Sequence, residues 1–274
     1  ARHLDRANGR VSAAQLGADE FVGPPLGGVL VALGTALPLL ASGALYAGAA
    51  LFFLALPRRS RAAAREAGAE RMLSAPISAF SMVIEGAGWL RGHRLLGGLA
   101  IVGGLASVAY AAPFAVLVLV ATERLGLDAA GYGVLLAVSA LGGLVGSFVT
   151  ARLRGRWGYR RTIVGSVVLG AGTMAALAGV TVPWVAAVLL AGYIGHAVVW
   201  GICVSSLRQR LVPDRLRGRV NASSKLVSLA GLTLGALLGG TLASGVGLAA
   251  PFALAAVLFA GCAVAVRALL RPDS

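Results

Sequence analysis

Long apolar runs separated by short arginine-rich stretches constrain this chain more than any other feature of its sequence. Each run has about 20 residues, enough for a helix to cross about 30 Å of hydrocarbon. None alternates with a period of two, so the strands of a membrane barrel are not expected, whereas helices satisfy their own backbone groups in lipid. The runs are residues 11–34, 36–56, 95–120, 131–151, 162–180, 183–207, 220–245 and 248–270. The sequence therefore predicts an all-α, polytopic transmembrane helix bundle with eight crossings.

The composition agrees with a membrane protein. Of 274 residues, 58% are hydrophobic, only 12% are charged and 39 are glycine; soluble domains have about 25% charged residues and about 7% glycine. The net charge of +14 lies in clusters between the apolar runs, so we expect no nucleic-acid partner. Cys203 and Cys262 both lie inside apolar runs. No disulfide framework, metal site or cofactor is expected from them.

The basic residues also predict the orientation. When the gaps between runs are assigned alternately to two sides, all but one of the 24 Lys and Arg residues fall on the same side. The exception is Arg124, which lies near Glu123 and Asp128. The positive-inside rule places the basic side in the cytoplasm. We therefore expect a multi-pass protein of the cell membrane with both ends of this chain cytoplasmic.

An internal repeat predicts how the runs are grouped. The pattern R-x-N followed by G-x-x-L-G-G begins at Arg6 and occurs again from Arg219. The second copy lies in the fifth of the six runs that follow the long connection 57–94, so the first copy is expected to be a fifth helix too. This predicts a two-helix remnant of an N-terminal bundle (1–56), a cytoplasmic linker (57–94) and a complete six-helix C-terminal bundle (95–274). About four upstream helices are then expected to be missing, and to be needed for activity.

Residues 207–222, LRQRLVPDRLRGRVNA, carry the strongest family resemblance. With the segments around Arg6 and Glu20, they resemble the major facilitator superfamily, nearest its enterobactin-exporter-like and macrolide-efflux-like branch. The resemblance implies two six-helix halves and identifies 207–222 as the loop between helices ten and eleven. The loop residues that it singles out are Arg208, Arg210, Pro213, Arg217, Gly218, Arg219 and Asn221. A second loop motif comprises Arg156, Gly158, Arg160 and Arg161; Gly155 stands where the family motif has an acid, so the charge-relay role of that acid is not expected here.

Asp19 and Glu20 are the first candidates for a binding site. In a helix that starts near residue 11 they lie close to the middle of the bilayer, where a carboxylate needs a cavity or a partner and its protonated form is favoured. Pro24 and Pro25 follow, and they deprive nearby carbonyls of helical donors. We expect a substrate- or proton-binding site, with Glu20 as the better candidate because the resemblance has Glu there. The alternative is that the helix begins later and that the two acids cap it.

Three more candidates lie in the run 183–207. His196 titrates near neutral pH in water and could bind substrate or protons, or could only hydrogen-bond a neighbouring helix. Tyr193 and Trp200 share roughly one helical face with His196, and could line a pocket for an apolar substrate or could simply pack. Lys225, a turn or so into the next run, is expected to extend to the cytoplasmic interface rather than to act as a substrate counter-ion.

Small residues recur every four positions in the run 220–245, at Gly231, Gly235 and Gly239. This spacing lets membrane helices approach closely and predicts a packing seam. No phosphate-binding loop of the form GxxxxGK[ST] occurs, so ATP hydrolysis is not expected.

The function that the sequence favours is secondary active transport by alternating access, with a small-molecule substrate and protons as partners within the lipid bilayer. The resemblance implies export of a small amphipathic compound, drug-like or siderophore-like, and no enzymatic activity. Two alternatives stay open: a truncated protein that does not transport, and a membrane-embedded enzyme acting on lipid-linked substrates.

Overall fold

The described part of the chain folds into helices, and none of it is in strands. A computed structural model describes residues 36–55 and 83–270, together with residues 26, 30, 33, 34 and 81. Its elements are α3 (Leu37–Ala55), α5 (Arg94–Phe114), α6 (Leu117–Leu119), η2 (Val120–Arg124), α7 (Ala129–Gly179), α8 (Pro183–Leu211), η3 (Asp214–Leu216), α9 (Arg217–Gly245) and α10 (Ala250–Leu269). The prediction of an all-helical membrane bundle is confirmed. Asp19, Glu20, most of the run 11–34 and residues 57–80 lie outside the described residues.

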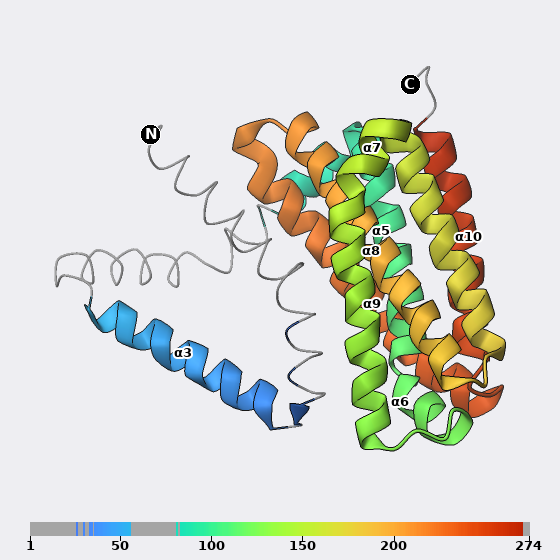
Figure 1. Ribbon diagram of the computed structural model, residues 1–274. Helices are drawn as coiled ribbons and strands as arrows, with labels where there is room; N and C mark the ends of the chain where they lie inside the picture. Colours follow the sequence, from blue (N-terminus) through green and yellow to red (C-terminus); the bar gives the residue numbers. More distant parts are fainter. Residues whose placement is uncertain are drawn as a thin grey trace.

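α7 contains two crossings that form a hairpin (Figure 1). The reversal occurs at Gly158, whose φ of 73° and ψ of 173° interrupt the helical backbone. A side chain disfavours this conformation, which glycine adopts readily. The sequence predicted two runs joined by a loop of about ten residues; instead helical backbone continues through that loop on both sides of Gly158. The loop residues extend the two helices beyond the membrane-crossing runs.

The first crossing of the bundle is also less regular than the sequence predicted. The run 95–120 was expected to be one helix, but α5 ends at Phe114 and is followed by the short α6 and by a π-helical turn, η2. Pro113 lies in the last turn of α5. Proline has no N–H to donate to the preceding turn, which explains why the helix breaks there.

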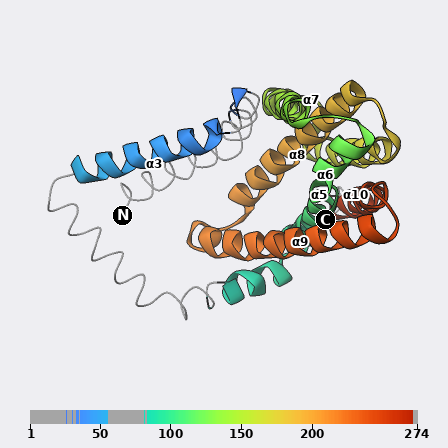
Figure 2. The same ribbon diagram turned by 90° about the horizontal axis from the view of Figure 1, so that it is seen from below.

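Glycine seams bring two pairs of helices into backbone contact. On α9, Gly231, Gly235 and Gly239 face α5, and a Cβ on Gly235 would lie only 2.5 Å from the carbonyl oxygen of Val108. Gly146 on α7 faces α8 in the same way, because its Cβ would lie 2.6 Å from the carbonyl oxygen of Gly195. The main packings are therefore α5 with α9 and α7 with α8, and α10 contacts both α5 and α7. Seen from below, α7 and α8 lie on one side of the bundle and α9 and α10 on the other (Figure 2).

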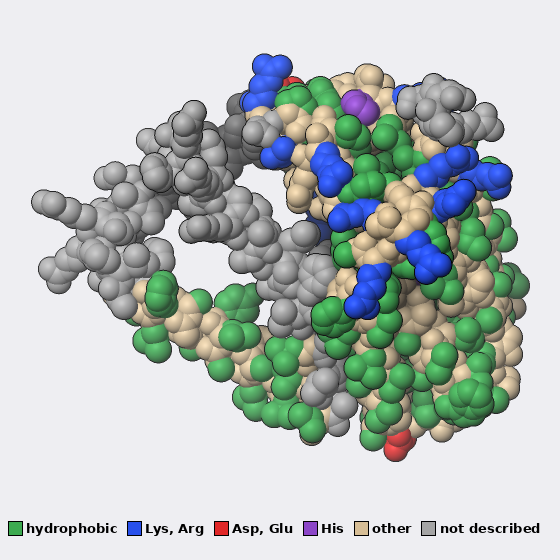
Figure 3. Space-filling view, turned by 45° about the horizontal axis from the view of Figure 1, so that its top comes forward, with side chains coloured by type: hydrophobic (Ala, Val, Ile, Leu, Met, Phe, Trp, Pro, Cys, Tyr) green, Lys and Arg blue, Asp and Glu red, His purple; other side chains and the backbone are tan. Residues whose placement is uncertain are grey.

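The helix ends that carry arginine lie together. Arg210 lies 5.5 Å from the ring of Tyr159 in the α7 hairpin, and Leu269 contacts Gly98 near the start of α5. The space-filling view shows Lys and Arg gathered at this end, while acidic side chains are visible both beside them and at the opposite end (Figure 3). The end formed by Arg94, the α7 hairpin, the α8–α9 loop and Arg267 is called the basic end below.

At the opposite end, Arg124 links η2 to α7 and α10. Arg124 donates hydrogen bonds of 2.6 and 2.8 Å to the carbonyl oxygens of Leu177 and Ala178, in the last turn of α7. Its guanidinium also lies 5.9 Å from the ring of Phe252 on α10. Carbonyls in the last turn of a helix have no helical donors, so a cation is favourable there.

α3 lies apart from this bundle in both ribbon views (Figures 1 and 2). Its apolar side chains are exposed, including Leu39 at 77% and Tyr46 at 79% of their full areas. An apolar helix exposed on this scale fits lipid or further apolar helices, not water. The predicted run 36–56 is confirmed as a helix of nearly the same extent.

Candidate functional site

A cavity of about 820 Å³ lies between the two packed helix pairs. α5, α8 and α9 supply most of its walls, while α7 and α10 contribute Val167, Phe259 and Cys262. Along α9 its lining begins at Asn221, near the basic end, and continues to Leu232, halfway along the helix. Helical rise makes this a length of about 16 Å. The cavity therefore runs from the basic end to the middle of the bundle.

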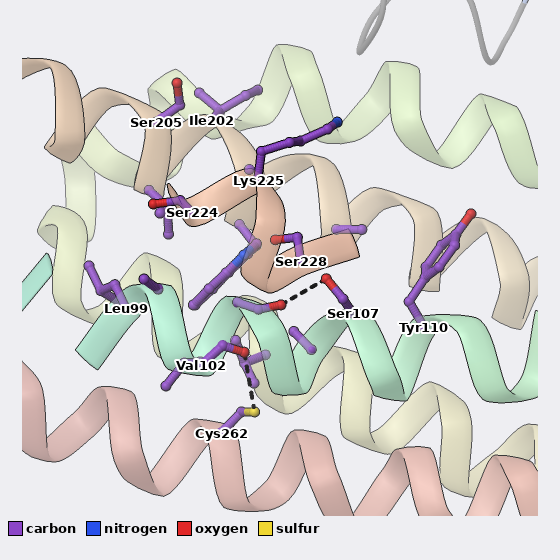
Figure 4. Close-up of a pocket in the computed structure, with 18 of the residues that line it drawn as sticks. Leu99, Val102, Ser107, Tyr110, Ile202, Ser205, Ser224, Lys225, Ser228 and Cys262 are labelled. Carbon is purple, nitrogen blue, oxygen red and sulfur yellow. Dashed lines mark hydrogen bonds between the residues drawn. The ribbon is translucent and has the colours of Figure 1, made fainter. Parts of the chain in front are cut away.

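The part of the cavity near the basic end is polar. Arg208 on α8 donates a 3.0 Å hydrogen bond from Nη1 to Oδ1 of Asn221 on α9, which joins the two helices across the mouth. One turn further in, Lys225 extends from α9 beside Ser224 and Ser228 (Figure 4). Ser107 on α5 lies further in, against Gly231 halfway along α9, and its hydroxyl donates a 2.9 Å hydrogen bond to the carbonyl oxygen of Gly103. No Asp or Glu is among the described residues that line the cavity.

The deep part of the cavity is aromatic. Tyr193 packs with Tyr110, Phe114 and Phe259, with ring centroids 5.9–6.0 Å apart, and with His196 at 4.7 Å. The His196 ring nitrogen Nδ1 is paired with the carbonyl oxygen of Tyr193. Trp200 lines the wall between these rings and the polar part. An apolar or aromatic group fits this surface by shape and by ring stacking.

His196 depends on a glycine in the neighbouring helix. A Cβ on Gly170 of α7 would lie 2.6 Å from Nε2 of His196, so only glycine leaves room for the imidazole in this position. The ring is almost fully buried, with 3% of the residue exposed. No charged group among the described residues makes an ion pair with it. This environment fits packing and hydrogen bonding at least as well as proton exchange.

Two buried hydroxyls on the cavity lining have no hydrogen-bond partner among the described residues: the phenol of Tyr193 and the Oγ of Ser224. Tyr193 is fully buried, and 6% of Ser224 is exposed. A buried polar group without a partner costs about 1–3 kcal/mol.

The structure brings His196, Tyr193 and Trp200 together on the cavity lining. Asp19 and Glu20 lie outside the described residues, so their place relative to the cavity stays a prediction. Gly231, Gly235 and Gly239 lie in the α5–α9 seam, behind the cavity wall.

The loop motifs form contacts at the basic end. Arg217 donates to the carbonyl oxygens of Gln209 and Val212 at 2.7 and 3.3 Å, closing the end of α8. Arg219 forms an ion pair with Glu85 in the helical segment 83–92. The carbonyl oxygen of Pro213 accepts a 2.9 Å hydrogen bond from the Leu216 N–H. Arg156 and Arg161 are exposed, Arg160 is half-buried, and Gly218 has open space where a Cβ would lie.

Sequence reasoning missed the polar half of the cavity. Lys225 was expected to extend to the interface; the structure leaves it exposed and also places it on the cavity lining with Ser224 and Ser228. One signal was available: positions 221, 225, 228 and 232 follow helical spacing and share one face of α9. The contribution of Ser107 from α5 had no such signal, because it depends on how α5 and α9 are rotated against each other. Among the described residues, no group of three or more His, Cys, Asp or Glu side chains could hold a metal ion.

The family model described as Major Facilitator Superfamily matches two overlapping stretches, residues 1–223 and 99–274, which together span the whole chain. No curated protein matches it significantly. No solved structure does so either.

Proposed function

Because the chain belongs to the major facilitator superfamily, we propose that it acts as a proton-coupled secondary transporter that exports a small amphipathic compound. Members of this family are membrane transporters and not enzymes, so the chain is a multi-pass membrane protein of a transporter family. Export, proton coupling and the nature of the substrate are the proposed parts.

The observation that carries the proposal is the cavity between α8 and α9. It combines a polar mouth at the basic end with an aromatic interior halfway along the helices, and its volume of about 820 Å³ suits a small organic molecule. In transporters built from two related halves, substrate sites lie near the bilayer midplane, where the halves meet. The deep part of this cavity lies about halfway along the helices, which supports a site at a similar depth.

The glycine seams support a mechanism of alternating access. Gly231, Gly235 and Gly239 hold α5 and α9 in backbone contact, so the two helices are suited to move as one unit. Alternating access needs such rigid groups of helices to rock against each other around the site.

The direction of transport and its coupling to protons are supported by different observations. Residues 207–222 resemble the loop between helices ten and eleven of an exporter branch, which favours efflux. Glu20 is the proposed proton-binding group, since a carboxyl group at membrane depth can exchange protons when its surroundings change. By the positive-inside rule we place the basic end in the cytoplasm, and the protein in the cell membrane.

The test is a substrate-accumulation screen in cells that make the protein, with and without a proton uncoupler. We expect at least one amphipathic compound to accumulate less in producing cells, and the difference to vanish with the uncoupler. Glu20→Gln, which cannot ionise, should abolish coupled efflux without lowering the amount of protein in the membrane. Coupled transport that persists in Glu20→Gln would remove Glu20 from the mechanism, and efflux insensitive to the uncoupler would contradict proton coupling.

A further inference from the structure

The charge on the cavity wall carries an inference about the substrate. Two cationic side chains line the cavity, Lys225 and Arg208, and no Asp or Glu is among the described lining residues. Charges of one sign in a recess with low-dielectric walls focus the electric field and attract ligands of the opposite sign. On the described surface, the cavity is suited to a negatively charged ligand.

The two cationic side chains differ in their hydrogen bonds. The Arg208 guanidinium gives one hydrogen bond to Asn221, which fixes it across the mouth between α8 and α9. Lys225 forms no hydrogen bond or ion pair with a described residue. It lies on the cavity lining, about 12 Å along α9 from the first residue of that helix, Arg217. An ammonium group on a flexible chain can move to meet an anion. Lys225 is therefore the better candidate for direct contact.

Serine hydroxyls lie beside Lys225, and the Tyr193 hydroxyl lies further in, among the aromatic rings. Ser224 and Tyr193 have buried oxygens without partners among the described residues, and Ser228 lies one turn from Ser224 along α9. Hydroxyls can donate to carboxylate, sulfonate or phosphate oxygens. Further in, Trp200 and Tyr110 offer apolar surface to the rest of the molecule.

We propose that this cavity binds amphipathic anions, with Lys225 contacting the acidic group and Trp200 and Tyr110 contacting an aromatic or aliphatic body. This inference rests on the proposed function only in taking the cavity as the substrate site, and it can be tested by binding alone. A small aromatic acid and an anionic lipid share this chemistry, and the experiment separates them.

The probes are three molecules of one shape: 2-naphthoate, the neutral 2-naphthamide and the cationic 2-naphthylmethylammonium. Equilibrium dialysis at pH 8 measures their binding to the protein in nanodiscs of zwitterionic lipid, with empty nanodiscs subtracted. We expect naphthoate to bind at least tenfold more tightly than the ammonium compound. Lys225→Gln should weaken naphthoate binding about tenfold, because the charge-assisted hydrogen bond to the carboxylate is lost. Naphthamide carries no charge, so its binding should change less than twofold.

Two further variants make the result specific. Lys225→Arg keeps the cation and should retain naphthoate binding within about threefold. Arg152→Gln removes an exposed charge that is not on the cavity lining and should leave binding unchanged. Repeating the measurement in nanodiscs with anionic lipid shows which kind of ligand the cavity takes. If the lipid lowers naphthoate binding and this effect requires Lys225, the ligand is a lipid headgroup. If the lipid does not lower naphthoate binding, the ligand is a small solute.

Three results would overturn the inference: tighter binding of the ammonium compound, an equal effect of Lys225→Gln on acid and amide, or no binding of any probe by the unmodified protein. Failure of the proposed function has a different signature. A protein that binds naphthoate through Lys225 but drives no efflux in the accumulation screen would uphold this inference and contradict the transporter proposal.

Discussion

Replacing Gly239 with alanine is expected to destabilise the bundle by about 2 kcal/mol or more, since it inserts a methyl group where two helix backbones already touch. A Cβ at this position would overlap the carbonyl oxygen of Ala112 and would lie 2.8 Å from both its carbonyl carbon and its Cα. Backbone atoms cannot rotate away as a flexible side chain can. α5 and α9 would have to separate along the seam that carries one wall of the cavity.

The adjacent residue provides the matched control. Gly240 lies in the same helix and has nothing within 4 Å of where its Cβ would lie, so Gly240→Ala should be neutral or slightly stabilising. The measurement is the midpoint of thermal unfolding in detergent, followed by loss of helical circular dichroism. Equal midpoints for the two variants would show that the seam is not packed as described.

Replacing Arg124 with alanine is the second change for which we expect a large effect, a loss of about 2–4 kcal/mol of stability, because two charge-assisted hydrogen bonds are removed together. Arg124 joins η2 to the last turn of α7 through the carbonyl oxygens of Leu177 and Ala178, and it also faces the ring of Phe252 on α10. The sequence predicts no other Lys or Arg at this end of the bundle.

Arg124→Lys should fall between the unmodified protein and Arg124→Ala. Lysine keeps the charge near the helix end, but it cannot place two fixed donors on two carbonyl oxygens. Arg156→Ala is the control, because Arg156 is an exposed arginine at the opposite end of the bundle. A stability of Arg124→Ala within about 0.5 kcal/mol of the control, which is the usual scatter for surface substitutions, would contradict this structural role.

The sequence predicted those parts of the fold that depend on one helix at a time. Apolar length was enough to predict the helices that the structure describes, and the four-residue spacing of Gly231, Gly235 and Gly239 was enough to expect a seam. Interruptions within a crossing were harder to foresee. Pro113 was visible in the sequence, but whether a proline bends or ends a membrane helix depends on the donors that its neighbours supply.

The candidate site could be predicted only in part, for a related physical reason. Tyr193, His196 and Trp200 share a face of one helix, so their association followed from spacing alone. The polar wall needs Arg208 from α8, Ser107 from α5 and Lys225 from α9 to point into the same space. That convergence depends on the rotation of each helix and on the separation of α8 from α9, and no local pattern encodes either.

Our central proposal is that water reaches the cavity between α8 and α9 from the basic end, and that this end faces the cytoplasm. Single cysteines placed by Ser228→Cys, Arg156→Cys and Val257→Cys test it, in a protein whose buried Cys203 and Cys262 are replaced by alanine. Ser228 lines the cavity, Arg156 is exposed at the basic end, and Val257, 70% exposed on α10, is an apolar surface position.

The measurement is labelling of these single cysteines by a membrane-impermeant maleimide in inverted and right-side-out vesicles. We expect Ser228→Cys and Arg156→Cys to react in inverted vesicles, and Val257→Cys to stay unreactive in both kinds of vesicle. An Arg156→Cys variant that reacts only in right-side-out vesicles, or a Ser228→Cys variant as unreactive as Val257→Cys, would contradict this proposal.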